Sequence, residues 1–185
     1  MTSRMRLQAA LLAGLLALPC LAQDRFAQSL GPYVPSPQPV VDRMLEAAAI
    51  KPGETVYDLG CGDARVLITA ARKFKARGVG VELSAELVKR ANAQIRDLGL
   101  QNRVTIIQGD LLEVDLHPAD VVTVYLLTSS NERLKPKLES SLKPGARVVS
   151  HDFIMPGWRA ARVEKIEAHG RTHTIYVYEM PPAKK

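Results

Sequence analysis

Between Gln38 and Lys143 the chain alternates between apolar residues at helical spacing and short runs rich in β-branched residues. Strands are predicted at 55–60, 78–82, 104–108, 121–127 and 146–150. Helices are predicted between them, with these residues facing inward: Val41, Leu45 and Ala48; Val66, Ala70 and Phe74; Leu87, Ala91, Ile95 and Leu98; Leu134, Leu138 and Leu142. This order predicts a doubly wound α/β sheet, whose ligand lies beyond the carboxyl ends of the strands.

Polar and conformationally special residues mark where these helices begin and end. Ser36 is placed to cap the first helix and Pro37 to open it, while Ser84 starts the third helix and Gly99 ends it. Pro136 is predicted at the first turn of the fourth helix, because a proline deeper in a helix removes a hydrogen bond.

The pattern changes after Trp158. Two β-rich runs, at 163–168 and 172–179, are separated by only three residues, which is too short for a crossover helix. They are therefore predicted to pair as an antiparallel hairpin at one edge, which completes a mostly parallel, seven-stranded sheet.

The first 22 residues differ from the rest and are predicted to be a secretory signal peptide. Two arginines precede an uncharged apolar run at 7–18, a proline follows it, and the small residues Cys20 and Ala22 suit a cut after Ala22. The apolar run is shorter than the ~20 residues that cross a bilayer. Export is therefore expected, with an uncleaved membrane anchor as the alternative, followed by a lip at 23–36 and a folded domain at 37–185.

The 185 residues carry a formal net charge of +6, so nucleic acid has to be considered as a partner. Loss of the 22-residue signal would remove two arginines and leave 163 residues at +4. Basic residues at 133–143 alternate with Glu132 and Glu139, as on a solvated helix face, so no nucleic-acid partner is expected. The four histidines and Cys61, the one cysteine of the mature chain, show no metal-ligand spacing, so no metal site is predicted.

The segment 58–65, DLGCGDAR, places glycines where a strand turns into a helix. Gly60 and Gly62 allow the backbone to approach a ligand closely there. The third glycine of a dinucleotide-binding turn would fall at Arg65, and Asp58 stands where an acid would repel phosphate and attract a cation. The pattern therefore favours a positively charged nucleoside without phosphate, a description that S-adenosylmethionine meets.

Two further acids follow the next strands in register with Asp58. Glu82 ends the second strand, where its carboxylate can accept both hydroxyl hydrogens of a ribose. Asp110 follows the third strand, placed to accept an adenine amine while Leu111 packs on the ring. Three acids at successive strand ends are a more specific signal than the glycines alone.

These motifs carry a resemblance to a known family. The segments DLGCGDAR (58–65), GVGVE (78–82) and QGDLLEVDL (108–116), with the closing hairpin, resemble the class I, seven-stranded S-adenosylmethionine-dependent methyltransferases over essentially the whole mature chain. The resemblance implies binding of S-adenosylmethionine. The cofactor-binding residues that we predict are Tyr33, Pro35, Asp58, Gly60, Gly62, Glu82, Asp110 and Leu111.

A closer resemblance concerns three other segments. YVPSPQPVVDRML (33–45), YLLTSSNERLKPKL (125–138) and PGARVVSHDF (144–153) look like a bacterial branch related to the small protein-lysine methyltransferases of archaea and mitochondria. This implies that Tyr33 to Ser36 form a lip over the cofactor. In relatives the position of Thr128 is more often proline.

Acceptor-binding groups of this fold usually follow the fourth strand. Tyr125 and Asn131 are therefore predicted to position the acceptor, with a core tyrosine and a helix cap as equally weighted alternatives. The pair His151 and Asp152 follows the fifth strand and is interpreted first as a hydrogen-bonded turn. Cys61 is interpreted as a small residue between glycines rather than as a nucleophile.

The sequence predicts an enzyme that methylates a nitrogen, with a protein lysine as the favoured acceptor. Little chain is inserted into the core of the fold to close a substrate pocket, which favours a macromolecular acceptor over the alternative, a small molecule. A non-catalytic, exported nucleoside-binding protein is the third hypothesis, because export would separate the protein from a cofactor made in the cytoplasm.

Overall fold

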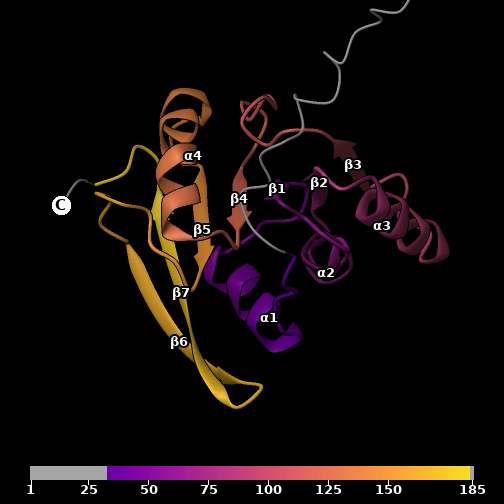
Figure 1. Cartoon of the computed structure of the whole chain (residues 1–185), viewed down its shortest axis with the longest axis horizontal. Helices are drawn as coiled ribbons and strands as arrows, with labels where there is room; N and C mark the ends of the chain where they lie inside the picture. The colour runs from indigo at the N-terminus through magenta and orange to yellow at the C-terminus, as the bar shows by residue number, and fades with distance from the viewer. Residues whose placement is uncertain (1–32, 184–185) are drawn as a thin grey trace, which may run out of the picture.

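Seven strands form one sheet in the order β3-β2-β1-β4-β5-β7-β6 (Figure 1). The computed structural model describes residues 33–183, so the predicted signal peptide and residues 23–32 of the lip lie outside the described residues. The strands are β1 (Thr55–Leu59), β2 (Arg77–Glu82), β3 (Val104–Gln108), β4 (Val121–Val124), β5 (Arg147–His151), β6 (Arg162–Ala168) and β7 (Arg171–Glu179). The first five pair in parallel, and β7 pairs antiparallel with β5 and β6. The predicted sheet and its edge hairpin are confirmed.

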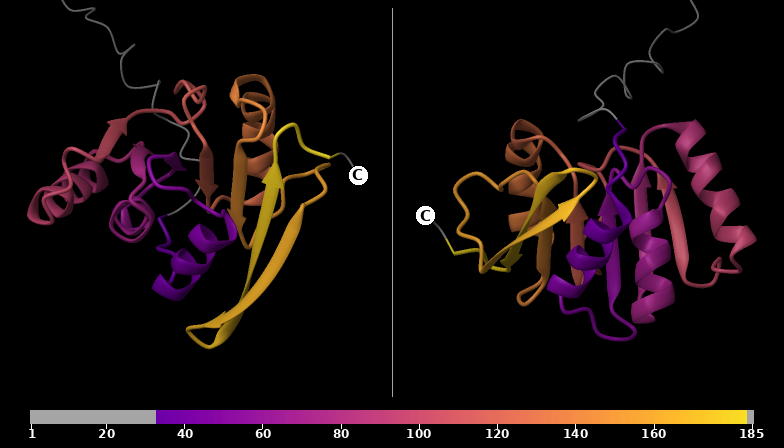
Figure 2. Two further views of the ribbon diagram at one scale, coloured as in Figure 1. Left: turned by 180° about the vertical axis from the view of Figure 1, so that it is seen from behind. Right: turned by 90° about the horizontal axis from the view of Figure 1, so that it is seen from below.

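Helices cover both faces of this sheet (Figure 2). They are α1 (Gln38–Ala47), α2 (Arg65–Phe74), α3 (Ala85–Asp97) and α4 (Thr128–Ser141). Because side chains alternate along a strand, Val56 and Val121 pack with α1, α2 and α3, whereas Tyr57 and Val122 pack with α4. Each of the inner strands therefore contributes to two cores, which explains why β4 is buried along its whole length.

The order of the strands determines where a ligand can bind. From β1 the chain proceeds to β2 and β3 on one side, and β4 then returns to pair with β1 on the other side. A crevice opens beyond the carboxyl ends of strands at such a reversal.

Four details of the predicted elements are wrong. Ser36 does not cap α1, because Pro37 occupies the cap position and no side chain bonds there. Pro136 lies inside α4 rather than in its first turn, because the polar residues from Thr128 onward are already helical.

The other two errors concern apolar residues. β4 ends at Val124, so the predicted strand 121–127 is too long, and the apolar residues Tyr125 and Leu126 that follow it line the crevice instead. Leu98 is 45% exposed at the end of α3 rather than buried. Among residues 33–183, no helix is both long and apolar enough to cross a membrane.

Candidate functional site

A cavity of about 480 Å³ lies at the crevice beyond β1, β2 and β4, within the size range typical of small-molecule sites. Each of the eight residues predicted to bind the cofactor lines it, as does Tyr125. The elements contribute in turn: β1 and its turn provide Asp58, Gly60 and Gly62, the end of β2 provides Glu82, the end of β3 provides Asp110 and Leu111, and the lip provides Tyr33 and Pro35.

Asp58 is a buried carboxyl in the wall of this cavity. It is only 6% exposed, and its Oδ1 accepts a hydrogen bond of 2.7 Å from the hydroxyl of Thr123 on the neighbouring strand β4. Burial raises the pKa of Asp58 to about 7, and the negative charges of Asp63 and Glu82 add to this effect, while the Thr123 bond opposes it. A cationic ligand would therefore stabilise the ionised carboxylate.

Glu82 shapes the turn above the cavity as well as its wall. Its Oε2 accepts a bond of 3.0 Å from the N–H of Gly62, and its Oε1 accepts one of 2.8 Å from the N–H of Ser84. Because a carboxylate offers about four lone-pair sites, each oxygen keeps a site for a ribose hydroxyl. These two backbone bonds hold the carboxylate in one orientation before a ligand arrives.

Asp110 and Leu111 form the far wall. Oδ1 of Asp110 accepts the N–H of Leu112 at 2.8 Å, and Leu111 is 9% exposed beside it. This pairing of an acceptor with an apolar side chain matches the amine edge and the face of an adenine ring.

Residues 33–36 of the lip are held to the glycine turn by Arg65, whose ion pair with Asp63 was not predicted from the sequence. Arg65 binds Asp63 with Nη2 at 2.6 Å from Oδ2, and its Nη1 donates to the carbonyl of Ser36 at 3.0 Å. Although burial alone would raise the pKa of Asp63, the bonds from Arg65 hold it below its usual value. Arg65, at the position of the missing third glycine, thus fastens the lip.

Gly62 provides the space that the Tyr33 ring needs. Gly62 has φ +53°, and a methyl group added there would overlap the ring, with Cδ2 at 2.9 Å. We expect Gly62→Ala to weaken binding of S-adenosylhomocysteine about tenfold in calorimetry, since left-handed strain of about 1–2 kcal/mol is combined with a displaced lip.

Gly99→Ala is the matched control for this variant. Gly99 has φ +66° with nothing within 4 Å of an added methyl group, and it lies beyond the end of α3. Gly99→Ala should lose stability through the same backbone strain and keep its affinity. Equal affinities for both variants would contradict the prediction.

The charges around the cavity suit S-adenosylmethionine. Asp58, Asp63, Glu82 and Asp110 line the cavity together with Arg65, the one basic residue among its described lining residues. This excess of acid fits a ligand with an ammonium and a sulfonium group and opposes a pyrophosphate.

The two residues predicted to position the acceptor have different surroundings. Tyr125 lines the cavity, and its hydroxyl accepts a bond of 3.0 Å from Nη2 of Arg171. Asn131 is fully buried inside α4 and lies outside the set of lining residues. Its amide donates to the carbonyls of Phe153 at 3.4 Å and Ile154 at 3.2 Å, so it holds the loop after β5.

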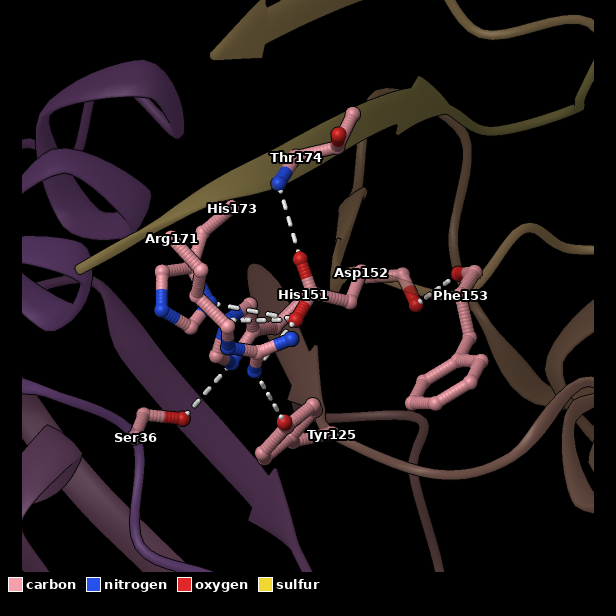
Figure 3. Close-up of polar contacts among 9 residues, drawn as sticks. Ser36, Tyr125, His151, Asp152, Phe153, Arg171, His173 and Thr174 are labelled. Atoms are coloured by element: carbon pink, nitrogen blue, oxygen red, sulfur yellow. Dashed lines mark hydrogen bonds and ion pairs between the residues drawn. The ribbon is translucent and has the colours of Figure 1, made fainter. Parts of the chain in front are cut away.

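Behind Tyr125 lies a buried network centred on His151 (Figure 3). The His151 ring stacks on Tyr125 with centroids 3.9 Å apart, and its two nitrogens contact Ser36 Oγ and His173 Nδ1, each at 2.8 Å. Burial lowers the pKa of His151 to about 4, despite the opposing charge of Asp152. The ring is therefore neutral near pH 7. His151 and Asp152 do form hydrogen bonds, as predicted from the sequence. Their partners are not confined to a local turn, however, and include Ser36, His173 and Arg171.

Comparison with known proteins gives this geometry a family context. Residues 58–162 match the family model described as the ANTKMT methyltransferase domain. A protein-lysine N-methyltransferase of Saccharolobus islandicus is 51% identical over 148 residues, which cover 80% of this chain and 92% of that protein. The adenine nucleotide translocase lysine N-methyltransferase of Mus musculus is 32% identical over 152 residues, which cover 78% of this chain and 66% of that protein.

A solved structure is similar over the same region. It is described as an RNA methyltransferase from Salinibacter ruber in complex with S-adenosyl-L-homocysteine. It is 46% identical, superimposes with a TM-score of 0.74, and the match covers 80% of this chain and 94% of that chain. The S-adenosyl-L-homocysteine bound in this relative is the demethylated form of S-adenosylmethionine, the ligand that the charges around the cavity of this chain suit.

Proposed function

Because the chain belongs to the family of S-adenosylmethionine-dependent methyltransferases that share the ANTKMT methyltransferase domain, we propose that it methylates the ε-amino group of a lysine in a protein. The observation that carries this proposal is the similarity to the archaeal protein-lysine N-methyltransferase over nearly its whole length.

The chain's own residues have a limited chemical task in such a reaction. The bound S-adenosylmethionine supplies a methyl group that its sulfonium has already activated. Asp58, Glu82 and Asp110 orient the cofactor, and the lip at Tyr33 covers it and excludes water. A lysine must lose its proton before it attacks, and desolvation in a covered cavity lowers the pKa of an ammonium group.

The charges at the cavity favour a lysine over a nucleic acid. The acids around Asp58 attract an approaching ammonium group and repel a phosphate backbone. An RNA acceptor is nevertheless the rival hypothesis, because the Salinibacter relative carries that description.

Labelled cofactor separates these acceptors. The protein is incubated with S-adenosylmethionine labelled in its methyl group and a cell extract that contains both envelope proteins and RNA. We expect label in a protein band that protease removes and ribonuclease does not. Label that only ribonuclease removes would establish the RNA acceptor, and label only in small molecules would establish the small-molecule alternative. Glu82→Gln is the control and should label far less than the wild-type protein when the cofactor is kept well below the concentration that saturates the variant.

We further propose that residues 1–22 direct export and are removed. The basic start, short apolar run and small residues before position 23 support this. Cells are fractionated, and the amino terminus is sequenced from each fraction. The expected form begins at Gln23 outside the cytoplasm, an intact Met1 in the membrane would indicate an anchor, and an intact Met1 in the cytosol would contradict export.

A further inference from the structure

A closed ring of contacts holds Tyr125 at the wall of the cavity. Its ring stacks on His151, and its hydroxyl accepts from Arg171. Arg171 also donates to Oδ2 of Asp152 at 3.0 Å, and this same oxygen lies 3.1 Å from Nδ1 of His173. His173 returns to His151 at 2.8 Å, which closes the ring (Figure 3).

The second nitrogen of His151 extends the ring of contacts to the lip. Ser36 Oγ lies 2.8 Å from Nδ1 of His151, although 115 positions separate the two residues. The carbonyl of Ser36 is held on its other side by Arg65, and Ser36 itself lines the cavity. His151 is thus in contact with two separate parts of the cavity wall, the lip and Tyr125.

We propose that His151 is a positioning residue that couples Ser36 of the lip to Tyr125, so that the position of Ser36 at the cavity fixes the tyrosine ring at the acceptor side. His151 is fully buried and lies outside the lining residues, so it acts only through these neighbours.

The cost of the network supports a task beyond packing. His151 and His173 are both at most 1% exposed, and the Nε2 atom of His173 is buried with no hydrogen-bond partner among the described residues, which costs free energy. A network that merely filled space would be replaceable by apolar side chains of similar volume. One that sets the angle of a ring in the cavity would not.

His151, Asp152 and His173 also offer three atoms within 4.8 Å of one another that could hold a metal ion. The Asp152 oxygen of this set already accepts a hydrogen bond from Arg171 and lies within hydrogen-bond distance of His173, so these short distances need no metal to explain them. A chelator is added to all titrations to remove any metal ion, so that any coupling measured belongs to the hydrogen-bonded network.

A triple-mutant cycle tests the coupling without any acceptor. Affinity for S-adenosylhomocysteine is measured by calorimetry on the full chain for Ser36→Ala, Tyr125→Leu and their combination, with and without His151→Phe. Once Ser36 is lost, His151 no longer holds the tyrosine, so loss of Tyr125 then costs less. We expect the double variant to bind about fivefold more tightly than the product of the single effects, and this excess to vanish with His151→Phe.

Two controls make the result specific. Ser36→Ala combined with Leu111→Val, on the adenine side of the cavity, should be additive. If His151→Phe does not fold, His173→Leu replaces it, since His173 holds the other ring nitrogen. Additive effects of Ser36→Ala and Tyr125→Leu, or an excess that persists in the altered background, would overturn the proposal even though wild-type binding establishes the cofactor site. A purely structural network would lower the melting temperature and leave the affinities additive.

Discussion

Glu82→Gln is expected to weaken binding of S-adenosylhomocysteine by about 100-fold. The carboxylate already accepts the N–H groups of Gly62 and Ser84, and its remaining lone pairs are the acceptors that face the cavity. Loss of two charge-assisted bonds at about 1.5 kcal/mol each accounts for this magnitude. The glutamine side chain has nearly the same shape as glutamate, but its NH₂ group faces one of the two backbone N–H donors and cannot accept a hydrogen bond from it.

Calorimetry at constant pH measures this effect, and Glu86→Gln is the control. Glu86 is an exposed acid in the first turn of α3, four positions from Glu82, and its substitution changes the net charge equally. If both variants lost affinity by the same factor, the effect would be one of general charge, and the ribose assignment of Glu82 would be wrong.

Asp58→Asn is expected to have opposite effects on ligand affinity and on stability. In the ligand-free protein the pKa of Asp58 is raised to about 7, so below that pH the carboxyl is neutral and attracts a cationic ligand weakly. Affinity of the wild-type protein for S-adenosylhomocysteine should therefore fall about tenfold for each pH unit below about 7. Asp58→Asn should bind weakly at every pH and match the wild-type protein near pH 5.

The stability effect has the reverse sign. An aspartate in the unfolded chain has a pKa near 3.9, well below that in the folded state. Between these values the folded protein binds more protons, so the stability of the ligand-free protein falls as pH rises from about 4 to 7. We expect Asp58→Asn to remove this slope and to raise the melting temperature at pH 8 by about 5 °C. A pH-independent wild-type affinity would show that the carboxyl is already ionised.

Much of the fold could be predicted because its apolar periods are strong and its turns are marked. The alternation of two cores along β1 and β4 follows from runs that are apolar on both faces, and Ser84 and Gly99 bound α3 as expected. Pro136 could not be placed correctly, because tertiary packing of Leu134 and Leu138 stabilises α4 on either side of the proline.

The cavity residues could be predicted for a related reason. Parallel strands bring their carboxyl ends to one edge, so acids that follow successive strands must converge. The network behind Tyr125 could not, because His173 reaches His151 only through the register in which β7 pairs with β5. That register depends on turn geometry and on packing of distant segments, which a single sequence does not display.

β7 is the last strand in chain order among residues 33–183, yet it does not lie at the margin of the sheet. β7, which ends at Glu179, is inserted between β5 and β6, and it carries Ile175 and Tyr178 into the two cores. Until it emerges from the ribosome, β5 has an unpaired edge and the cores are incomplete. The sheet can therefore close only after the chain through Glu179 has left the ribosome.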